Sequence, residues 1–287
     1  MNLIIGIIIV CGSVAGGYLM SGGNLLALWH PNEVVIIGGA AFGAFVISNP
    51  MKVVLTVMKS LPTLMKGPRY DKAAYMDLLS LLYDLFAKAR KEGLMAIEDD
   101  VEEPENSEIF KRYPMILKDR HAVEFITDYL RLMVGGNMNP FELENLMDVE
   151  IETHHQEAEL PASAINKVAE GLPGFGIVAA VMGITITMAA IGGPIDVIGA
   201  KVAAALVGTF LGILLAYGFV GPMGAALEHI VREEGRFFEV IKVSLLATVN
   251  GYSPQVAVEF GRKAMYPSMR PSFRELEEHI KQKKAGG

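Results

Sequence analysis

Residues 205–222 read ALVGTFLGILLAYGFVGP and lie within Val202–Leu227, a stretch without Asp, Glu, Lys or Arg. An apolar helix of about 20 residues is long enough to cross the hydrocarbon core of a membrane. Three further stretches are equally free of these charges and long enough to cross: Leu3–Met20, Val34–Met51 and Gly171–Ile195. The sequence therefore predicts an all-α protein with four transmembrane helices.

Polar and small residues distinguish the quoted stretch from a plain membrane anchor. Thr209 offers a hydroxyl inside the membrane, and Pro222 lacks an N–H, so the Gly218 carbonyl loses its helical donor. Gly208 and Gly212 lie four residues apart, which allows a neighbouring helix to approach closely. A membrane anchor with ordinary small-residue packing is the simpler interpretation of this stretch taken alone.

The overall composition excludes several classes of protein. Hydrophobic residues make up 52% of the 287 residues and charged residues 20%, so polar and apolar side chains must be separated along the chain. The net charge of -7 argues against nucleic acid as a partner. Cys11 is the single cysteine, so no intrachain disulfide forms. The sequence has no dinucleotide- or phosphate-binding motif and no CxxC, and we expect neither an enzyme nor a bound cofactor.

Lys and Arg are distributed unevenly along the chain. They gather in residues 52–170 and 228–287, and Lys201 is the only one in the two short connectors between spans. The positive-inside rule places both basic segments in the cytoplasm. The first span has no basic region before it, so we expect it to be retained and not cleaved. The expected organisation has four parts: a hairpin of spans 1 and 2 at 1–57, a large cytoplasmic helical domain at 58–170, a hairpin of spans 3 and 4 at 171–227, and a cytoplasmic helical tail at 228–287.

The cytoplasmic segment contains a run of basic and then acidic side chains. Residues 75–89 have apolar side chains at helical spacing, and basic residues that include Arg90 follow them. Acidic residues gather between Glu98 and Glu103. Such a run is usually a solvated helix face, although at the tip of a cytoplasmic hairpin it could also bind a charged partner. His154 and His155 are adjacent and point to different sides of a helix, so we expect solvated side chains there and no metal site.

The four apolar stretches contain no Asp, Glu, Lys, Arg or His. Proton carriers normally hold an acid or a histidine within the membrane. We therefore expect that this chain does not conduct ions alone and that another subunit supplies the titrating group. The polar side chains that would line the path beside it are Thr185, Thr187, Thr209 and Tyr217.

Several motifs carry a resemblance to a known family. Ala205–Leu214 reads ALVGTFLGIL and is followed, after seven further residues, by Pro222. Other stretches that match are residues 16–31, 75–90, 129–154, 172–183 and 250–263. Over nearly its whole length the chain resembles the MotA/TolQ/ExbB family, and most closely the members that work in the flagellar motor.

The resemblance implies a role and a set of partners. Such members are stator subunits in the bacterial inner (cell) membrane, where a homopentamer surrounds two MotB chains and ion flow produces torque on the rotor protein FliG. The membrane aspartate of MotB binds the ion, which agrees with the absence of an acid from the four stretches. We expect the same partners for this chain, together with membrane lipid and no nucleic acid.

The resemblance also assigns individual residues. Pro173 and Pro222 match the family prolines that couple ion flow to movement, and Thr209 matches a threonine that faces the channel. Ala180 stands where sodium-driven relatives look to carry a threonine, so H⁺ is the expected coupling ion in place of Na⁺, although Thr185 could still add an oxygen. The full set expected along the ion path and its coupling is Pro173, Ala180, Thr185, Thr209, Tyr217 and Pro222.

Arg90 and Glu98 match the charged pair of the family's cytoplasmic loop that engages FliG. A related interpretation is an ExbB- or TolQ-like proton-driven energiser of an outer-membrane system, with the same ion mechanism and a different load. A self-sufficient channel is disfavoured by the missing acid and the lack of paired repeats. A non-conducting scaffold would need only the glycine faces.

Overall fold

The protein is helical throughout the part of the chain that the structure describes. The computed structural model describes residues 2–136, 138–189 and 191–285, and these ranges contain helices and no strand. The predicted all-α class is therefore confirmed. Asn137, which belongs to the 129–154 motif, lies outside the described residues.

Two compact units make up the chain. The first unit contains residues 1–67 and 158–230, and the second unit contains residues 68–157 and 231–287. Two long helices contribute residues to both units: α10 (Pro140–Met188) and α12 (Gly221–Val249).

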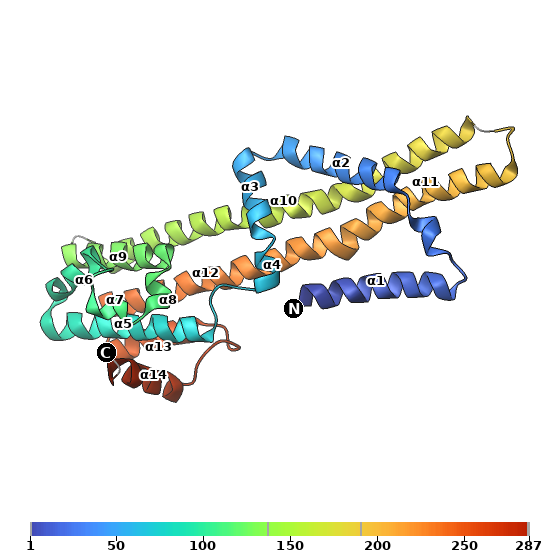
Figure 1. Ribbon diagram of the computed structural model, residues 1–287. Coiled ribbons are helices and arrows are strands. Elements are labelled where there is room, and N and C mark those ends of the chain that lie inside the picture. The colour runs from blue at the N-terminus through green and yellow to red at the C-terminus, as the bar shows by residue number, and fades with distance from the viewer. Residues whose placement is uncertain (1, 137, 190, 286–287) are drawn as a thin grey trace. The chain divides into compact units, whose positions relative to one another are not determined.

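The first unit is built mainly from long apolar helices. Besides parts of α10 and α12, its elements are α1 (Asn2–Met20), η1 (Leu25–Leu28), α2 (Pro31–Ser48), α3 (Met51–Ser60), α4 (Thr63–Lys66), α11 (Ile195–Leu215) and the π-helical turn η3 (Ala216–Val220). Figure 1 shows α10 and α11 running antiparallel and side by side away from their connector, with α2 lying along them.

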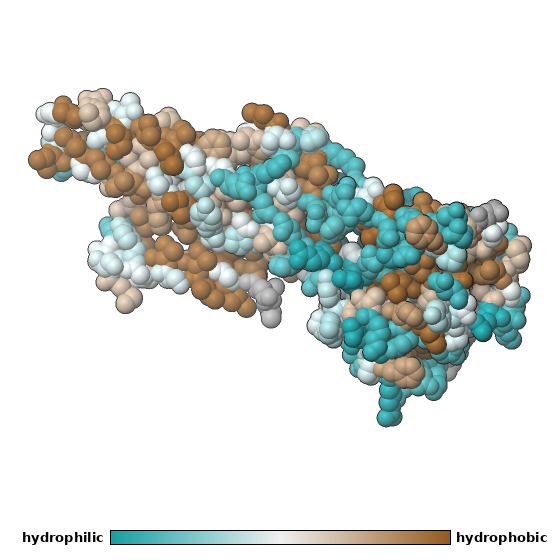
Figure 2. Space-filling view, turned by 180° about the vertical axis from the view of Figure 1, so that it is seen from behind, coloured by the Kyte–Doolittle hydropathy of each residue, from teal (hydrophilic) through white to brown (hydrophobic). Residues whose placement is uncertain are grey.

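Among the described residues, four helical segments are long and apolar enough to cross a membrane: Leu3–Met20, Leu25–Ser48, Pro140–Met188 and Ile195–Val249. Many of their side chains point outward although they are apolar. Ile8 is 64% exposed, Ile47 is 89% exposed and Leu206 is 64% exposed. In Figure 2 hydrophobic colour gathers at the end of the molecule that the apolar parts of these helices form, and hydrophilic colour lies over other parts. Exposed apolar area of this kind suits contact with lipid or protein, and the predicted four-span class is confirmed.

Two small clusters of buried hydrophobic side chains join the helices of the first unit. Ile37 and Ala41 on α2 pack in one cluster with Leu172 and Ala179 on α10. A second cluster joins α3 to the neighbouring turns of α10 and α12, and its buried members include Val57. The interior of the first unit is therefore a set of small contacts between helices, without one large core.

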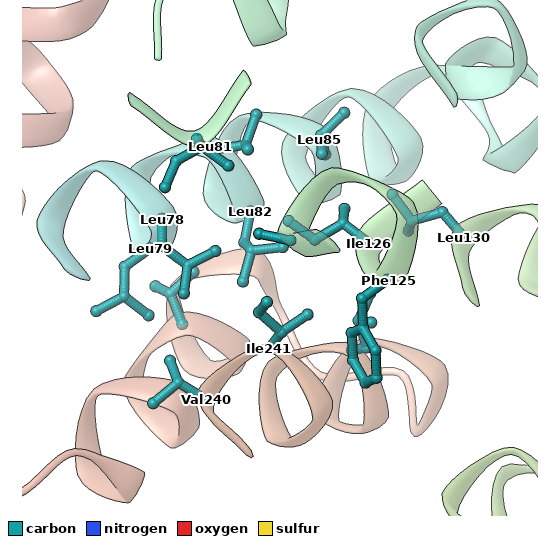
Figure 3. Close-up of a cluster of buried hydrophobic side chains, with 14 of the residues drawn as sticks. Leu78, Leu79, Leu81, Leu82, Leu85, Phe125, Ile126, Leu130, Val240 and Ile241 are labelled. Atoms are coloured by element: carbon teal, nitrogen blue, oxygen red, sulfur yellow. The ribbon is translucent and has the colours of Figure 1, made fainter. Parts of the chain in front are cut away.

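The second unit has a single large core. Besides parts of α10 and α12, its elements are α5 (Lys72–Glu92), η2 (Leu94–Ile97), α6 (Glu98–Glu102), α7 (Glu108–Lys111), α8 (Pro114–Leu117), α9 (Arg120–Gly135), α13 (Pro254–Ala264) and α14 (Phe273–Ala285). Helix α5 lies at its centre, and in Figure 3 its leucines meet side chains of α9 and α12. The labelled core residues are Leu78, Leu79, Leu81, Leu82, Leu85, Phe125, Ile126, Leu130, Val240 and Ile241.

Buried carboxylates join the elements of the second unit. Asp84 on α5 accepts a hydrogen bond from the Tyr113 hydroxyl at 2.9 Å and pairs with Arg112 at 3.2 Å. Asp119 accepts a hydrogen bond from the Tyr70 hydroxyl at 2.6 Å. Burial, and then the nearby Asp84 carboxylate, raise the pKa of Tyr113, so this phenol stays a neutral donor.

The last helix, α14, is fixed to α5 by polar contacts. Ser272 and Glu275 form a reciprocal capping box at its start, because each backbone N–H donates to the other residue's side chain. Lys72 of α5 donates to Glu275 at 2.9 Å, and His279 lies 2.8 Å from Asp77. The hydrogen bond from the Ser272 backbone, with help from Lys72, lowers the pKa of Glu275 to about 2. Helices α13 and α14, which belong to the predicted helical tail, pack against α5, while the cytoplasmic location of the tail stays a prediction.

Candidate functional site

Glycines set the distance between α10 and α11. A Cβ added to Gly212 would lie 2.7 Å from the Leu172 carbonyl oxygen and 2.9 Å from the Gly176 Cα. A Cβ on Gly176 would lie 2.8 Å from the Gly208 carbonyl oxygen. The two backbones are therefore in direct contact. The predicted small face of Gly208 and Gly212 is confirmed, and its neighbouring helix is α10 of the same chain.

Two of the predicted ion-path positions lie at this contact. Thr209 is half-buried, and its Cα lies 3.4 Å from the place a Cβ on Gly176 would occupy. Ala180 is also half-buried, and its backbone nitrogen lies 3.3 Å from the place of a Cβ on Gly208. The structure thus brings Thr209 and Ala180 to neighbouring positions on facing helices, while their roles in ion flow stay predictions.

The other predicted polar positions of the path lie elsewhere. The Thr185 hydroxyl donates to the Val181 carbonyl at 2.9 Å, and its side chain is exposed on α10. The Thr187 hydroxyl donates to the Gly183 carbonyl at 2.8 Å and is 4% exposed. Tyr217 is 74% exposed. Thr185 and Tyr217 therefore point to the surface of the single chain, where another helix or lipid can reach them.

The two predicted coupling prolines lie at weakened turns that touch each other. Pro173 is inside α10 and leaves the Ala169 carbonyl without its usual donor. A π-helical turn ends at Val220, two residues before Pro222, and the N–H of the intervening Gly221 donates to the Ala216 carbonyl, five residues back. A Cβ on Gly221 would lie 3.8 Å from the Ala169 Cβ. The turn weakened by Pro173 therefore contacts the end of the π-helical turn, an irregularity that is frequent at functional sites.

An open groove connects the surroundings of Pro222 to the first helix. Its volume is about 580 Å³, and Gly6, Ile7 and Val10 of α1 line it together with Tyr217 and Pro222. Tyr217 and Pro222, two of the predicted ion-path and coupling positions, therefore line the same groove. This groove is separate from the glycine contact that holds Thr209.

Helix α2 departs from the expectation that the spans contain no acid. The expectation holds for the stretch 34–51, but the helix begins at Pro31, so Glu33 lies in the first turn of a segment long enough to cross a membrane. Glu33 is 8% exposed and occupies the buried stripe of α2 with Ile37, Ala41 and Phe45. The four-residue spacing of these residues in the sequence indicates a shared helix face, and a stretch defined by the absence of charge does not include Glu33.

The predicted rotor-binding pair lies near the end of α5. Arg90 is exposed, and its Nη1 donates to the Gly251 carbonyl at 3.2 Å and the Tyr252 carbonyl at 3.5 Å. Glu98 is the exposed first residue of α6. Among the described residues no ion pair joins Arg90 to Glu98. Arg90 thus holds the turn that follows α12, and its contact with a rotor stays a prediction together with that of Glu98.

Part of the acidic run has a structural role inside the second unit. Asp100 is 6% exposed, pairs with Lys88 at 2.7 Å and accepts a hydrogen bond from Ser107. Glu102 pairs with Arg131 at 2.6 Å, and this hydrogen bond lowers the pKa of Glu102. The sequence pattern predicts one solvated face, or one docking face, for the whole run. The structure divides it into these paired acids and exposed ones such as Glu98.

His154 of the long helix α10 is exposed, as expected for a solvated side chain, and His155 is half-buried. The His154 ring lies 5.1 Å from the Phe238 ring and 5.8 Å from the His121 ring, measured between centroids. No group of three or more His, Cys, Asp or Glu side chains that could hold a metal ion occurs in the described ranges.

These features define a class of protein: an all-helical membrane protein of four spans, whose third and fourth spans touch through glycine and whose polar helices form a separate core. Residues 4–93 match the family model described as Motility protein A N-terminal, and residues 118–240 match that of the MotA/TolQ/ExbB proton channel family. The chain belongs to the MotA/TolQ/ExbB proton channel family.

Relatives and solved structures agree with this family. Motility protein A of Salmonella typhimurium is 52% identical over 98% of this chain and 95% of its own length. Chemotaxis protein LafT of Vibrio parahaemolyticus is 41% identical over 98% of both chains. The structure of C. jejuni MotAB has a TM-score of 0.76 at 22% identity and covers 94% of this chain and 98% of its own. The flagellar MotAB stator complex from Bacillus subtilis has a TM-score of 0.73 at 23% identity, over 96% and 98%. The two structures share the fold.

Proposed function

We propose that this chain is a stator subunit of the bacterial flagellar motor, which forms a proton-conducting inner-membrane complex with MotB and converts proton flow into torque on the rotor protein FliG. The observation that carries the proposal is the 52% identity to a motility protein A along 98% of the chain. Two structures of the same fold are titled as MotAB, which supports MotB as the partner. In this proposal residues 58–170 and 228–287 lie in the cytoplasm.

The proposed coupling ion is H⁺, because Ala180 offers no hydroxyl beside Thr209. One charge that crosses about 150 mV releases roughly 3.5 kcal/mol. Such an energy biases a two-state step by roughly several hundred-fold. Protonation of the MotB carboxylate would remove a charge beside α10 and α11 and allow the subunits to step. The touching turns near Pro173 and Pro222 would let the cytoplasmic helices follow.

The proposed assembly is a homopentamer around two MotB chains. Open glycine faces on the outer helices support association with further helices. A Cβ added to Gly12 or Gly16 on α1, or to Gly39 or Gly43 on α2, would meet no atom within 4 Å. Helices associate in lipid through such small-residue faces, so these four positions are available to a neighbouring subunit.

The proposed rotor contact is made by exposed charges of the second unit, with Arg90 and Glu98 among them. Arg90 also donates to the Gly251 carbonyl, so this residue acts on the shape of the surface as well as on its charge. A charge reversal at Glu98 alters the surface alone. Complementary charge reversals on the rotor would therefore restore function more fully for Glu98 than for Arg90.

Rotation of tethered cells tests the proposal. Cells without stators of their own receive this chain with its MotB partner and a compatible rotor, and cells that receive MotB alone are the control. We expect rotation that survives removal of sodium and stops when the proton gradient is collapsed. Rotation that is lost with sodium would overturn the assignment of the ion. No rotation would favour an ExbB- or TolQ-like energiser of an outer-membrane system.

A further inference from the structure

One buried acid of the first unit has no role in the function proposed above. The Oε2 atom of Glu33 is buried and accepts no hydrogen bond from the described residues. A buried carboxylate oxygen without a donor is unfavourable unless something else binds it. Glu33 lies in the first turn of α2, where the helix dipole stabilises its negative charge but supplies no partner for this oxygen.

The unpartnered oxygen lies at the contact of α10 and α11. A Cβ on Gly208 would lie 2.9 Å from Glu33 Oε2, 3.1 Å from the Ala179 Cβ and 3.3 Å from the Ala180 nitrogen. Glycine at position 208 therefore leaves the space that the carboxylate occupies. The same contact holds Ala180 and Thr209, two of the predicted ion-path positions.

Few other charged groups belong to the elements around this carboxylate. His30 precedes α2, and its Nε2 lies 3.2 Å from the Ala27 carbonyl oxygen. On α11 the charged residues are Asp196, which is exposed, and Lys201, which is half-buried. The apolar part of α10 from residue 171 to residue 188 carries no Asp, Glu, Lys, Arg or His. Glu33 is thus the one buried acid among these neighbouring groups.

We propose that Glu33 is a proton-exchanging carboxyl which this chain itself contributes to the ion path; this inference rests on the proposed function. A hydronium ion from water on the side of the first connector gives its proton to the Glu33 carboxylate and leaves a water molecule. The neutral carboxyl then passes that proton, through water, to the membrane carboxylate that the partner is proposed to supply. Glu33 returns to its charged form, so each cycle moves one proton and no other bond changes.

Three variants of the complete complex separate proton exchange from a structural role. Glu33→Gln keeps the size of the side chain and cannot titrate, whereas Glu33→Asp titrates on a shorter side chain. Asp196→Asn is the matched control, because it removes one carboxylate from an exposed position in the first turn of α11. The amount of each variant that co-purifies with the partner shows whether the complex has assembled.

Rotation of tethered cells at a series of external pH values is the first measurement. We expect Glu33→Gln to rotate at less than about a tenth of the wild-type speed, because a positioned acid or base speeds proton transfer by at least that factor. Glu33→Asp should recover part of the speed and shift its pH profile, and Asp196→Asn should rotate as the wild type does. An assembled Glu33→Gln complex with wild-type speed at every pH would overturn the inference. Failure of the wild type to rotate would refute the proposed function instead.

Infrared spectroscopy of the purified complex is the second measurement and does not depend on motility or on the Gln variant. We expect a carboxyl band that appears as the pH is lowered, moves in Glu33→Asp and stays in Asp196→Asn. A spectrum that is the same for the wild type and Glu33→Asp at all pH values would contradict proton exchange at this residue, even if Glu33→Gln does not assemble.

Discussion

The closest backbone contact in the first unit predicts a specific effect of one added methyl group. In Gly212→Ala the new Cβ would lie 2.7 Å from the Leu172 carbonyl oxygen, 2.9 Å from Gly176 Cα and 3.2 Å from Gly176 N. All three are backbone atoms of α10, so no side chain can rotate away and the helices must separate. Overpacking of this kind costs about 1–3 kcal/mol. Alanine recovers up to about 1 kcal/mol of helix propensity.

We therefore expect Gly212→Ala to destabilise the complex by about 1–2 kcal/mol, which lowers the midpoint of thermal unfolding by about 2–8 °C. Gly199→Ala is the matched control. It lies in the same helix, and its new Cβ would meet nothing within 4 Å, so it should be neutral or slightly stabilising.

The assay is thermal unfolding of the purified complex, with both variants compared with the wild type at the same detergent and protein concentrations. Rotation of tethered cells then shows whether the spacing of the third and fourth spans also affects torque. Equal unfolding midpoints for Gly212→Ala and Gly199→Ala would refute the reasoning, because they would show that α10 and α11 are not held at backbone contact.

Three further predictions follow from other contacts. Pro222→Leu supplies the missing N–H to the helix and should abolish rotation while the complex still assembles; unchanged rotation in tethered cells would rule out a coupling role. Arg90→Ala removes the donor to the Gly251 carbonyl at 3.2 Å and should cost about 1 kcal/mol, visible as faster hydrogen exchange in the turn after α12, with Arg90→Lys intermediate. The pKa of Glu275 is lowered from 4.5 to about 2. The charged carboxylate therefore stabilises α14 fully above pH 4.5, and this stabilisation is lost as the pH falls towards 2. Proteolysis of α14 should therefore increase over this acidic range, and Glu275→Gln should remove the pH dependence.

The membrane helices could be predicted from charge alone, and their ends could not. A charge-free window finds the apolar centre of α2 but starts one residue after Glu33, because a helix can begin with polar residues that precede its apolar part. Burial of Glu33 depends on Gly208, which is far away in the sequence. The four-residue spacing of Glu33, Ile37 and Ala41 predicts that they share one face of a helix. It does not show which part of the chain covers that face.

Some contacts of the candidate site depend on local spacing and could be predicted from the sequence. Others join residues that are far apart in the sequence, and these could not be predicted. The glycine face at Gly208 and Gly212 depends on local spacing, and the structure confirms it. The contact of Arg90 with Gly251 depends on two helices that meet through the core of the second unit, and no local pattern reveals it. The burial of Asp100 depends likewise on Lys88 and Ser107, so a run of acids looks uniform in the sequence and is not uniform in the fold.

The contact between the turn that Pro173 weakens and the π-helical turn before Pro222 has a mechanical consequence. Two antiparallel rods in contact can bend only if one slides along the other, unless both are compliant at the same level. Here α10 lacks a regular hydrogen bond at the Ala169 carbonyl, and the facing helix is irregular at the end of the π-helical turn. The two irregular turns meet, because a Cβ on Gly221 would lie 3.8 Å from the Ala169 Cβ. Bending is therefore concentrated at this one level of the two helices. The glycine contact between α10 and α11 can keep its register while the turns near Pro173 and Pro222 bend.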